Sequence, residues 1–195
     1  MEKFEEYQKY RWFYTSSGKL AIGGKNALQN DELVSLMKNS KKNYITMHTI
    51  EPGSPFLFII SDINKVKKSD IGECAVFTGC FSRAWRSGKK DAIIEVFNSA
   101  SMYKQSSMRI GTWGVLGDIK KVKVKLFLVL TKQKGILRAV PKSSIKNKKN
   151  ILLKIAPGVV DKKDMLPKLY IGFSEKFSQE EILSALPAGG IKIIK

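Results

Sequence analysis

The stretch that decides the fold is RWFYTSSGKLAIGGKN, residues 11–26. Two runs of aromatic and β-forming residues, Arg11–Ser16 and Lys19–Ile22, flank the dipeptide Ser17-Gly18. A Ser-Gly dipeptide between short β-prone runs is a hairpin signal, so the stretch predicts two antiparallel strands. Gly23-Gly24 then ends the second strand.

A helix is expected directly after the hairpin. Asn26 is a good N-cap, and the apolar spacing that follows it predicts a helix to about Lys38. Two further strands are expected at Asn43–Ile50 and Phe56–Ser61, joined by a turn with two prolines at Glu51–Pro55.

The clearest helical pattern starts at Asp70. Asp70 and Glu73 have the spacing of a capping box, and Ser69 is an alternative cap. Apolar positions then recur at steps of three and four: Ile71, Cys74, Ala75, Thr78, Phe81 and Trp85. The helix is expected to end at Ser87-Gly88.

The rest of the chain contains more strands than helices. Strands are expected at Ala92–Phe97, Met108–Val115, Lys121–Leu130, Gly135–Val140, Asn150–Ala156 and Ile191–Ile194, and short helices at Lys162–Tyr170 and Gln179–Leu186. Because helices and strands do not alternate regularly, the pattern favours an α+β fold with a mostly antiparallel or mixed sheet and about four helices. A length of 195 residues suits a single domain, 1–195.

Positive charge is concentrated in one part of the sequence. The chain has 35 basic and 17 acidic residues, and residues 119–160 contain 12 basic residues and no acidic one. We therefore separate a core, residues 1–118, from a basic C-terminal part, residues 119–195. A lysine-rich composition explains part of the excess, but it does not explain an acid-free segment of this length. Such a segment attracts polyanions.

Within this segment the spacing predicts a row of lysines on one strand face. Lys121, Lys123 and Lys125 alternate with Val122 and Val124. The longest apolar run, residues 126–130, is far too short to span a membrane. The N-terminus has no signal-peptide pattern, so a cytoplasmic protein without a membrane partner is expected.

Catalytic and metal sites are not apparent. His48 is the single histidine, and Ser54 with Glu51 or Asp62 lacks the sequence setting of a hydrolase nucleophile. Cys74 and Cys80 would lie about 240° apart around one helix, so they would not hold one ion together. We expect no catalysis, no metal and no cofactor.

Two groups of residues are suited to bind phosphate. Gly23-Gly24-Lys25-Asn26 combines glycines, a cation and a helix start, although a strand-to-helix turn that needs glycine would look the same. Arg83, Arg86 and Lys90 would share one helix face if the helix continues, and this face could also be merely solvated.

Taken together, these motifs resemble the NFACT-R domain of the RqcH/NEMF ribosome quality-control family. The resemblance rests on residues 10–31, on His48 with Pro52-Gly53-Ser54-Pro55, on Phe81–Trp85 and on Met108–Gly111. Lys154–Gly158 and Leu186–Gly190 resemble the end of the archaeal members. The chain is thus similar to a stand-alone NFACT-R domain, and the N-terminal and coiled-coil domains of the long quality-control factors do not fit into 195 residues.

The resemblance implies an RNA-binding module that acts on tRNA or ribosomal RNA, in translation, ribosome-associated quality control or tRNA modification. The ribosome is a further expected partner, and DNA is not excluded. Residues expected to bind nucleic acid are Arg11, Gly23, Gly24, Lys25, Asn26, Arg83, Arg86, Lys89, Lys90, Arg109, Lys121, Lys123 and Lys125. Family-motif residues are His48, Pro52, Gly53, Ser82 and Trp85. The alternatives are an RNA-processing enzyme and a protein adaptor that docks on a translation complex.

Overall fold

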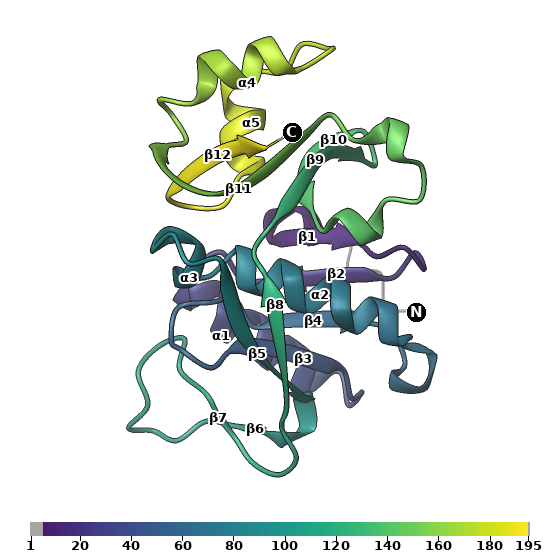
Figure 1. Cartoon of the computed structure of the whole chain (residues 1–195). Coiled ribbons are helices and arrows are strands. Elements are labelled where there is room, and N and C mark those ends of the chain that lie inside the picture. Colours follow the sequence, from purple (N-terminus) through teal and green to yellow (C-terminus); the bar gives the residue numbers. More distant parts are fainter. Residues whose placement is uncertain (1–5, 195) are drawn as a thin grey trace.

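Two main antiparallel sheets organise residues 6–194, which are the residues that the computed structural model describes (Figure 1). The first sheet has the order β1 (Arg11–Tyr14), β2 (Leu20–Gly23), β4 (Leu57–Ile60), β3 (Ile45–Thr49), β5 (Asp91–Asn98) and β8 (Lys120–Lys125). The hairpin predicted around Ser17-Gly18 is confirmed as β1–β2.

Helices cover both faces of the first sheet. Helix α1 (Ala27–Asn39) begins at Asn26, whose side-chain oxygen accepts a hydrogen bond from the backbone N–H of Gln29 at 2.9 Å. Helix α2 (Lys68–Cys80) packs on the opposite face through a buried apolar cluster that includes Phe77. These two helices give the hairpin and the following strands the buried faces that their apolar residues require.

The second sheet has the order β10 (Ile136–Val140), β9 (Leu128–Gln133), β11 (Leu153–Asp161) and β12 (Gly190–Ile194). Helices α4 (Leu166–Gly172) and α5 (Gln179–Ala185) belong to this part. One apolar cluster runs from α2 through Leu126 to β9, so a single core joins the two sheets. In residues 6–194 four of the five α-helices have seven or more residues, which confirms an α+β fold with about four helices.

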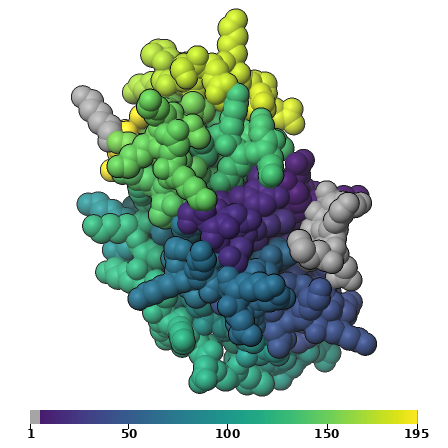
Figure 2. Space-filling model, turned by 90° about the vertical axis from the view of Figure 1, so that its right-hand side faces the viewer, coloured from purple at the N-terminus to yellow at the C-terminus, as the bar shows by residue number. Residues whose placement is uncertain are grey.

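Edge strand β1 lies against the second sheet. The side chain of Gln133 accepts a hydrogen bond from the backbone N–H of Tyr14 at 2.8 Å and donates one to the Tyr14 carbonyl at 2.9 Å. Figure 2 shows the purple N-terminal strands directly against the green C-terminal part. The polar groups of this sheet edge are therefore satisfied by side chains instead of another strand.

The predicted long helix after Asp70 is wrong at both ends. It begins after Lys67, and Asp70 occupies the third helical position, where its carboxylate accepts from the Lys67 N–H at 2.8 Å. It ends at Cys80, and Ser82 caps a separate short helix, α3 (Arg83–Arg86). The Ser82 hydroxyl accepts from Ala84 N–H and donates to the Gly79 carbonyl, which is the physical reason for the break.

Two predicted strands also differ. Residues 108–115 form no continuous strand. Instead, the segment is mainly a loop between β6 (Met102–Tyr103) and β7 (Gly114–Val115), because Gly111 has a φ of +78° that interrupts extended backbone. Residues 121–130 are divided between β8 and β9, since the chain passes from the first sheet to the second at Leu126 and Phe127.

Five 3₁₀ helices complete the described elements: η1 (Tyr7–Lys9), η2 (Ile63–Lys65), η3 (Ser99–Ser101), η4 (Lys142–Ser144) and η5 (Lys148–Asn150). Among residues 6–194, the helices are all too short or too polar to cross a membrane.

Candidate nucleic-acid interface

Two glycine-containing turns are held together by the buried side chain of Asn30. Its amide oxygen accepts a hydrogen bond from the Phe56 N–H at 3.3 Å, and its amide nitrogen donates to the Ser54 carbonyl at 3.5 Å. A Cβ at Gly24 would overlap the Asn30 amide and lie 2.7 Å from the Asn30 backbone nitrogen. Gly24 is therefore required for close packing, which joins the turn at residues 23–26 to the turn at residues 51–55.

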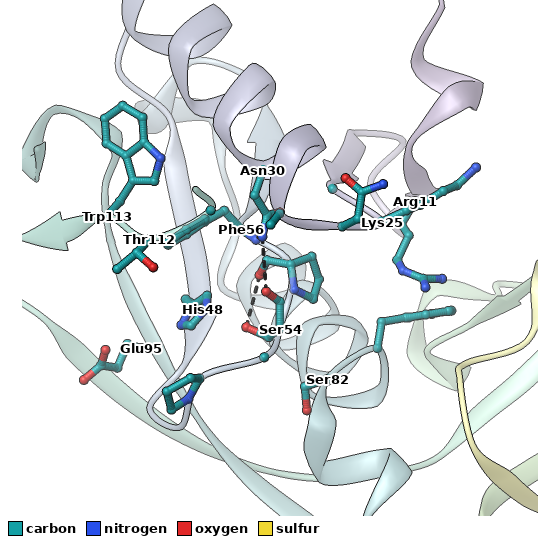
Figure 3. Close-up of a pocket in the computed structure, with 18 of the residues that line it drawn as sticks. Arg11, Lys25, Asn30, His48, Ser54, Phe56, Ser82, Glu95, Thr112 and Trp113 are labelled. Atoms are coloured by element: carbon teal, nitrogen blue, oxygen red, sulfur yellow. Dashed lines mark hydrogen bonds between the residues drawn. The ribbon is translucent and has the colours of Figure 1, made fainter. Parts of the chain in front are cut away.

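A cleft of about 580 Å³ opens where these turns meet (Figure 3). Its wall includes the start of α1, the α2–α3 junction, strands β3 and β5, and the loop at residues 110–113. Nine of the residues expected from the sequence line it: Arg11, Gly24, Lys25, Asn26, His48, Pro52, Gly53, Ser82 and Arg86. The fold thus brings together motifs that are up to 75 positions apart in the sequence.

One end of the cleft is cationic. Arg11 and Lys25 lie there in Figure 3, and the Arg11 guanidinium lies over the Phe81 ring at 4.6 Å from its centroid. Burial lowers the pKa of Arg11 to about 10. The pKa of Lys25 is also lowered, by burial and then by the charges of Arg11 and Arg138. Arg11 remains charged at neutral pH, so this end favours an anion.

The middle and the other end are mostly aromatic. His48 stacks on Phe56 with ring centroids 4.6 Å apart, and its Nδ1 lies 2.6 Å from the Thr49 carbonyl oxygen. Burial lowers the pKa of His48, so the imidazole is neutral at physiological pH and Nδ1 donates to this carbonyl. Trp113 is fixed by a hydrogen bond from its indole N–H to Asp31 at 2.6 Å. Such a surface offers ring faces to unpaired bases.

The predicted lysine row lies on the same sheet face as the cleft. Lys121 is the cross-strand partner of Glu95, which lines the cleft, and partners in antiparallel strands point to the same face. Lys123 and Lys125 continue this row, and all three side chains are exposed as the alternation predicted. Lys123 also forms an ion pair with Asp91 at 3.5 Å. The row extends the positive surface beyond the cleft.

Helix α3 divides the predicted arginine cluster. Arg86 lines the cleft, whereas Arg83 lies outside it and donates its backbone N–H to the Gly53 carbonyl at 2.8 Å. Since α3 ends at Arg86, the prediction that Arg83, Arg86 and Lys90 share one helix face is wrong. Lys89 forms an ion pair with Glu51 at 2.7 Å.

Other expected residues lie near the cleft without lining it. Trp85 is fully buried and donates its indole N–H to the Gly190 carbonyl at 3.1 Å, so it is a core residue. Arg109 is exposed beside the loop that lines the cleft, and its carbonyl accepts from Lys104 at 2.9 Å. Gly23 packs under Pro55.

Sequence reasoning missed Asn30, which lines the cleft, and Arg138, which lies beside its cationic end. Asn30 organises the turns, and Arg138 donates its Nε hydrogen to the Trp12 carbonyl at 3.1 Å, next to Arg11. Arg138 lies in the acid-free segment, which was predicted to attract polyanions as a whole. Nothing in its spacing indicated that strand β10 returns to β1.

The sequence matches a family model and a known relative. Residues 9–117 match the family model described as the NFACT protein RNA binding domain. The chain is 28% identical over 203 aligned positions to the archaeal Rqc2 homolog aRqcH of Methanocaldococcus jannaschii. This alignment covers 97% of the chain but only 29% of that relative, so the chain spans less than a third of the relative's length.

A solved structure shares the fold. The C-terminal part of the fibronectin/fibrinogen-binding protein from Streptococcus suis superposes with a TM-score of 0.53 at 20% identity, over 60% of this chain and 45% of that one. At this identity the likeness concerns the fold alone.

Proposed function

Because the chain belongs to the family of NFACT protein RNA-binding domains, we propose that it binds tRNA or ribosomal RNA in ribosome-associated quality control. Archaeal Rqc2 homology supports this setting, with the ribosome as a partner and the cytoplasm as the location. Residues 1–195 would act as one unit, with the basic C-terminal part adding charge to the family core.

The observation that carries the proposal is the convergence of the family motifs on one cationic cleft. Arg11, Lys25 and Arg86 line it together with the glycine turns, and the row that begins at Lys121 continues the positive surface. Lysines and arginines supply salt-dependent phosphate contacts, and aromatic side chains supply faces for unpaired bases.

The role we propose is binding without catalysis. His48 is the single histidine of the chain; its Nδ1 is occupied by the Thr49 carbonyl, and its lowered pKa makes it a weak base at neutral pH. Because His48 stacks on Phe56, its role is structural, as part of the cleft wall. The proposed function needs no cofactor.

Salt dependence tests the proposal. Four to six phosphate contacts give a slope of log affinity against log salt of about −3 to −5. Fluorescence anisotropy with tRNA and with a ribosomal RNA fragment, between low and physiological salt, measures it. A flat titration contradicts the proposal.

Matched variants locate the contact. Arg86→Ala, inside the cleft, should lower RNA affinity by about 1.5 to 3 kcal/mol if it bonds a phosphate. Arg83→Ala, in the same short helix but outside the lining of the cleft, and Lys123→Ala should lower it less. Equal small losses in folded variants would mean that the cleft is not the site of binding.

A further inference from the structure

Three cationic side chains, those of Arg11, Lys25 and Arg138, meet where β1 faces the C-terminal part, and Lys162 adds a fourth charge from that part. Arg11 pairs in register with Gly23, which places Lys25 just beyond it in the chain. Arg138 reaches the neighbouring residue of β1 through the Trp12 carbonyl. Lys162 follows β11 and donates to the Leu183 carbonyl at 2.9 Å. The β1–β2 hairpin and strand β10 thus bring positive charge to one place, and Lys162 contributes charge from the segment after β11.

The effect of each charge on the others supports their proximity. The pKa of Arg138 is lowered to about 10 by burial and then by Arg11. Burial also lowers the pKa of Lys162, and the next largest cause is again Arg11. These side chains therefore repel one another in a partly buried setting.

No carboxylate within residues 6–194 forms an ion pair with any of the four. The ion pairs of this part of the chain all involve other lysines. Asp161 raises the pKa of Lys162, but it lies outside ion-pair distance. Like charges held close together without counter-charge destabilise a fold, and a bound anion would remove the repulsion.

We infer that Arg11, Lys25 and Arg138 form a binding site for one phosphate group of the RNA, with Lys162 adding positive charge from the C-terminal part. This inference rests on the proposed function and specifies where one phosphate of the RNA binds. The Arg11 guanidinium presents a fork of N–H donors suited to phosphate, while Lys25 supplies a point charge. Arg138 is held by the Trp12 carbonyl, so it contributes positive electrostatic potential at the phosphate more than a direct contact.

The position of this site relative to the cleft determines how the RNA lies. Arg11 and Lys25 also line the cleft, so the phosphate sits at its cationic end. The nucleotide attached to this phosphate then extends into the cleft toward His48 and Phe56. Either a 5′-terminal phosphate or an internal phosphodiester has the negative charge that these cationic side chains would bind.

The first test uses inorganic phosphate and the full chain. Phosphate should raise the melting temperature more than sodium chloride of equal ionic strength does. Lys25→Gln should remove at least half of this increase. Without phosphate its melting temperature should equal or exceed that of the wild type, because one repelling charge is gone. Lys68→Gln is the matched control, since Lys68 is exposed at the start of α2, on the other face of the sheet.

The second test measures RNA affinity with 5′-phosphorylated and 5′-hydroxyl oligoribonucleotides. Lys25→Gln and Arg11→Gln should weaken binding by about tenfold, and Lys68→Gln by less than about threefold. A loss seen only with the 5′-phosphate identifies a terminal phosphate, and an equal loss identifies an internal one.

The two tests separate the two proposals. If RNA binds tightly but Lys25→Gln behaves as Lys68→Gln does in both assays, the phosphate site is wrong and the RNA-binding function stands. If phosphate stabilises the wild type selectively but no RNA binds, the site stands for another phosphate ligand and the RNA-binding function is wrong.

Discussion

Arg138 and Trp12 are joined twice: the Nε hydrogen is donated to the Trp12 carbonyl at 3.1 Å, and the guanidinium lies over the indole at 4.6 Å from the ring centroid. The pair connects β10 of the second sheet to edge strand β1 of the first. Since Arg11 is the next residue, the same contact brings the C-terminal part to the cationic end of the cleft. Arg138 thus contributes to the contact between the two sheets beside the cationic end of the cleft.

Arg138→Met should destabilise the protein by about 1 to 3 kcal/mol, because the Trp12 carbonyl loses its charged donor in a buried setting. Urea denaturation measures this change. Arg138→Lys keeps the charge but loses the planar fork, so it should recover only part of the stability. Equal midpoints for Arg138→Met and wild type would mean that the sheets are held together without this residue.

Gly24→Ala should destabilise the protein by about 2 kcal/mol, because the added methyl group overlaps the Asn30 amide that joins the two turns. Gly72→Ala is the control with the opposite expected sign. Gly72 is an exposed helical residue with open space at its Cβ position, so alanine should stabilise α2 by about 0.5 to 1 kcal/mol. Thermal unfolding checks both. A neutral Gly24→Ala would show that the turn adapts without loss.

Asp70 should make the fold sensitive to acid. It is buried and accepts hydrogen bonds from the Ser17 hydroxyl at 2.6 Å and the Lys67 N–H at 2.8 Å. Burial alone would raise the pKa of Asp70, but these bonds and Lys19 outweigh it, so the pKa is lowered. A carboxylate with a lowered folded-state pKa stabilises the protein above its unfolded pKa, and this contribution is lost as the pH falls through the folded value.

The free energy of unfolding should therefore fall below about pH 4, and Asp70→Asn should reduce the steepness of that fall. Asp118→Asn, at an exposed position, should leave the pH profile as in the wild type. Parallel profiles for Asp70→Asn and wild type between pH 2 and 7 would assign the acid sensitivity to other carboxylates.

His48→Ala should lower stability by about 1 to 2 kcal/mol, because the stacking on Phe56 and the bond to the Thr49 carbonyl are lost. RNA affinity should change by less than about threefold, because the ring of Phe56 remains in the cleft wall to stack on a base, and no reaction on RNA should disappear. Incubation of the purified protein with total tRNA, with and without divalent metal, measures the latter. Cleavage or modification of tRNA by the wild type that His48→Ala abolishes would make this protein an enzyme.

Local signals predicted much of the fold. The hairpin around Ser17-Gly18 and the cap at Asn26 are decided by short-range backbone preferences, and both are confirmed. Predictions failed where a tertiary contact overrides the local pattern. The apolar stripe continues through Phe81, yet the hydroxyl of Ser82 starts a new helix. The run at residues 121–130 looks continuous because the alternation of lysine and valine leads directly into an apolar stretch, although the two halves belong to different sheets.

In the candidate site, too, local features were predictable and tertiary contacts were not. The glycine turns and Arg11 were predictable because their residue types carry the chemistry. Their convergence on one cleft depends on Asn30, and a lone asparagine inside a helix gives no such signal. Strands β9 and β10 form a local hairpin around Lys134-Gly135, but the contact of Arg138 with Trp12 joins residues 126 positions apart and has no sequence pattern.

Photo-crosslinking of the purified protein to RNA in a cell extract tests the central claim most directly, because it identifies both the bound RNA and the peptides in contact with it. The account predicts crosslinks from the cleft wall, in residues 48–56, 81–86 and 110–113, to tRNA or ribosomal RNA. Crosslinks confined to the opposite face, on α2, or to the lysines of residues 142–149 would contradict it.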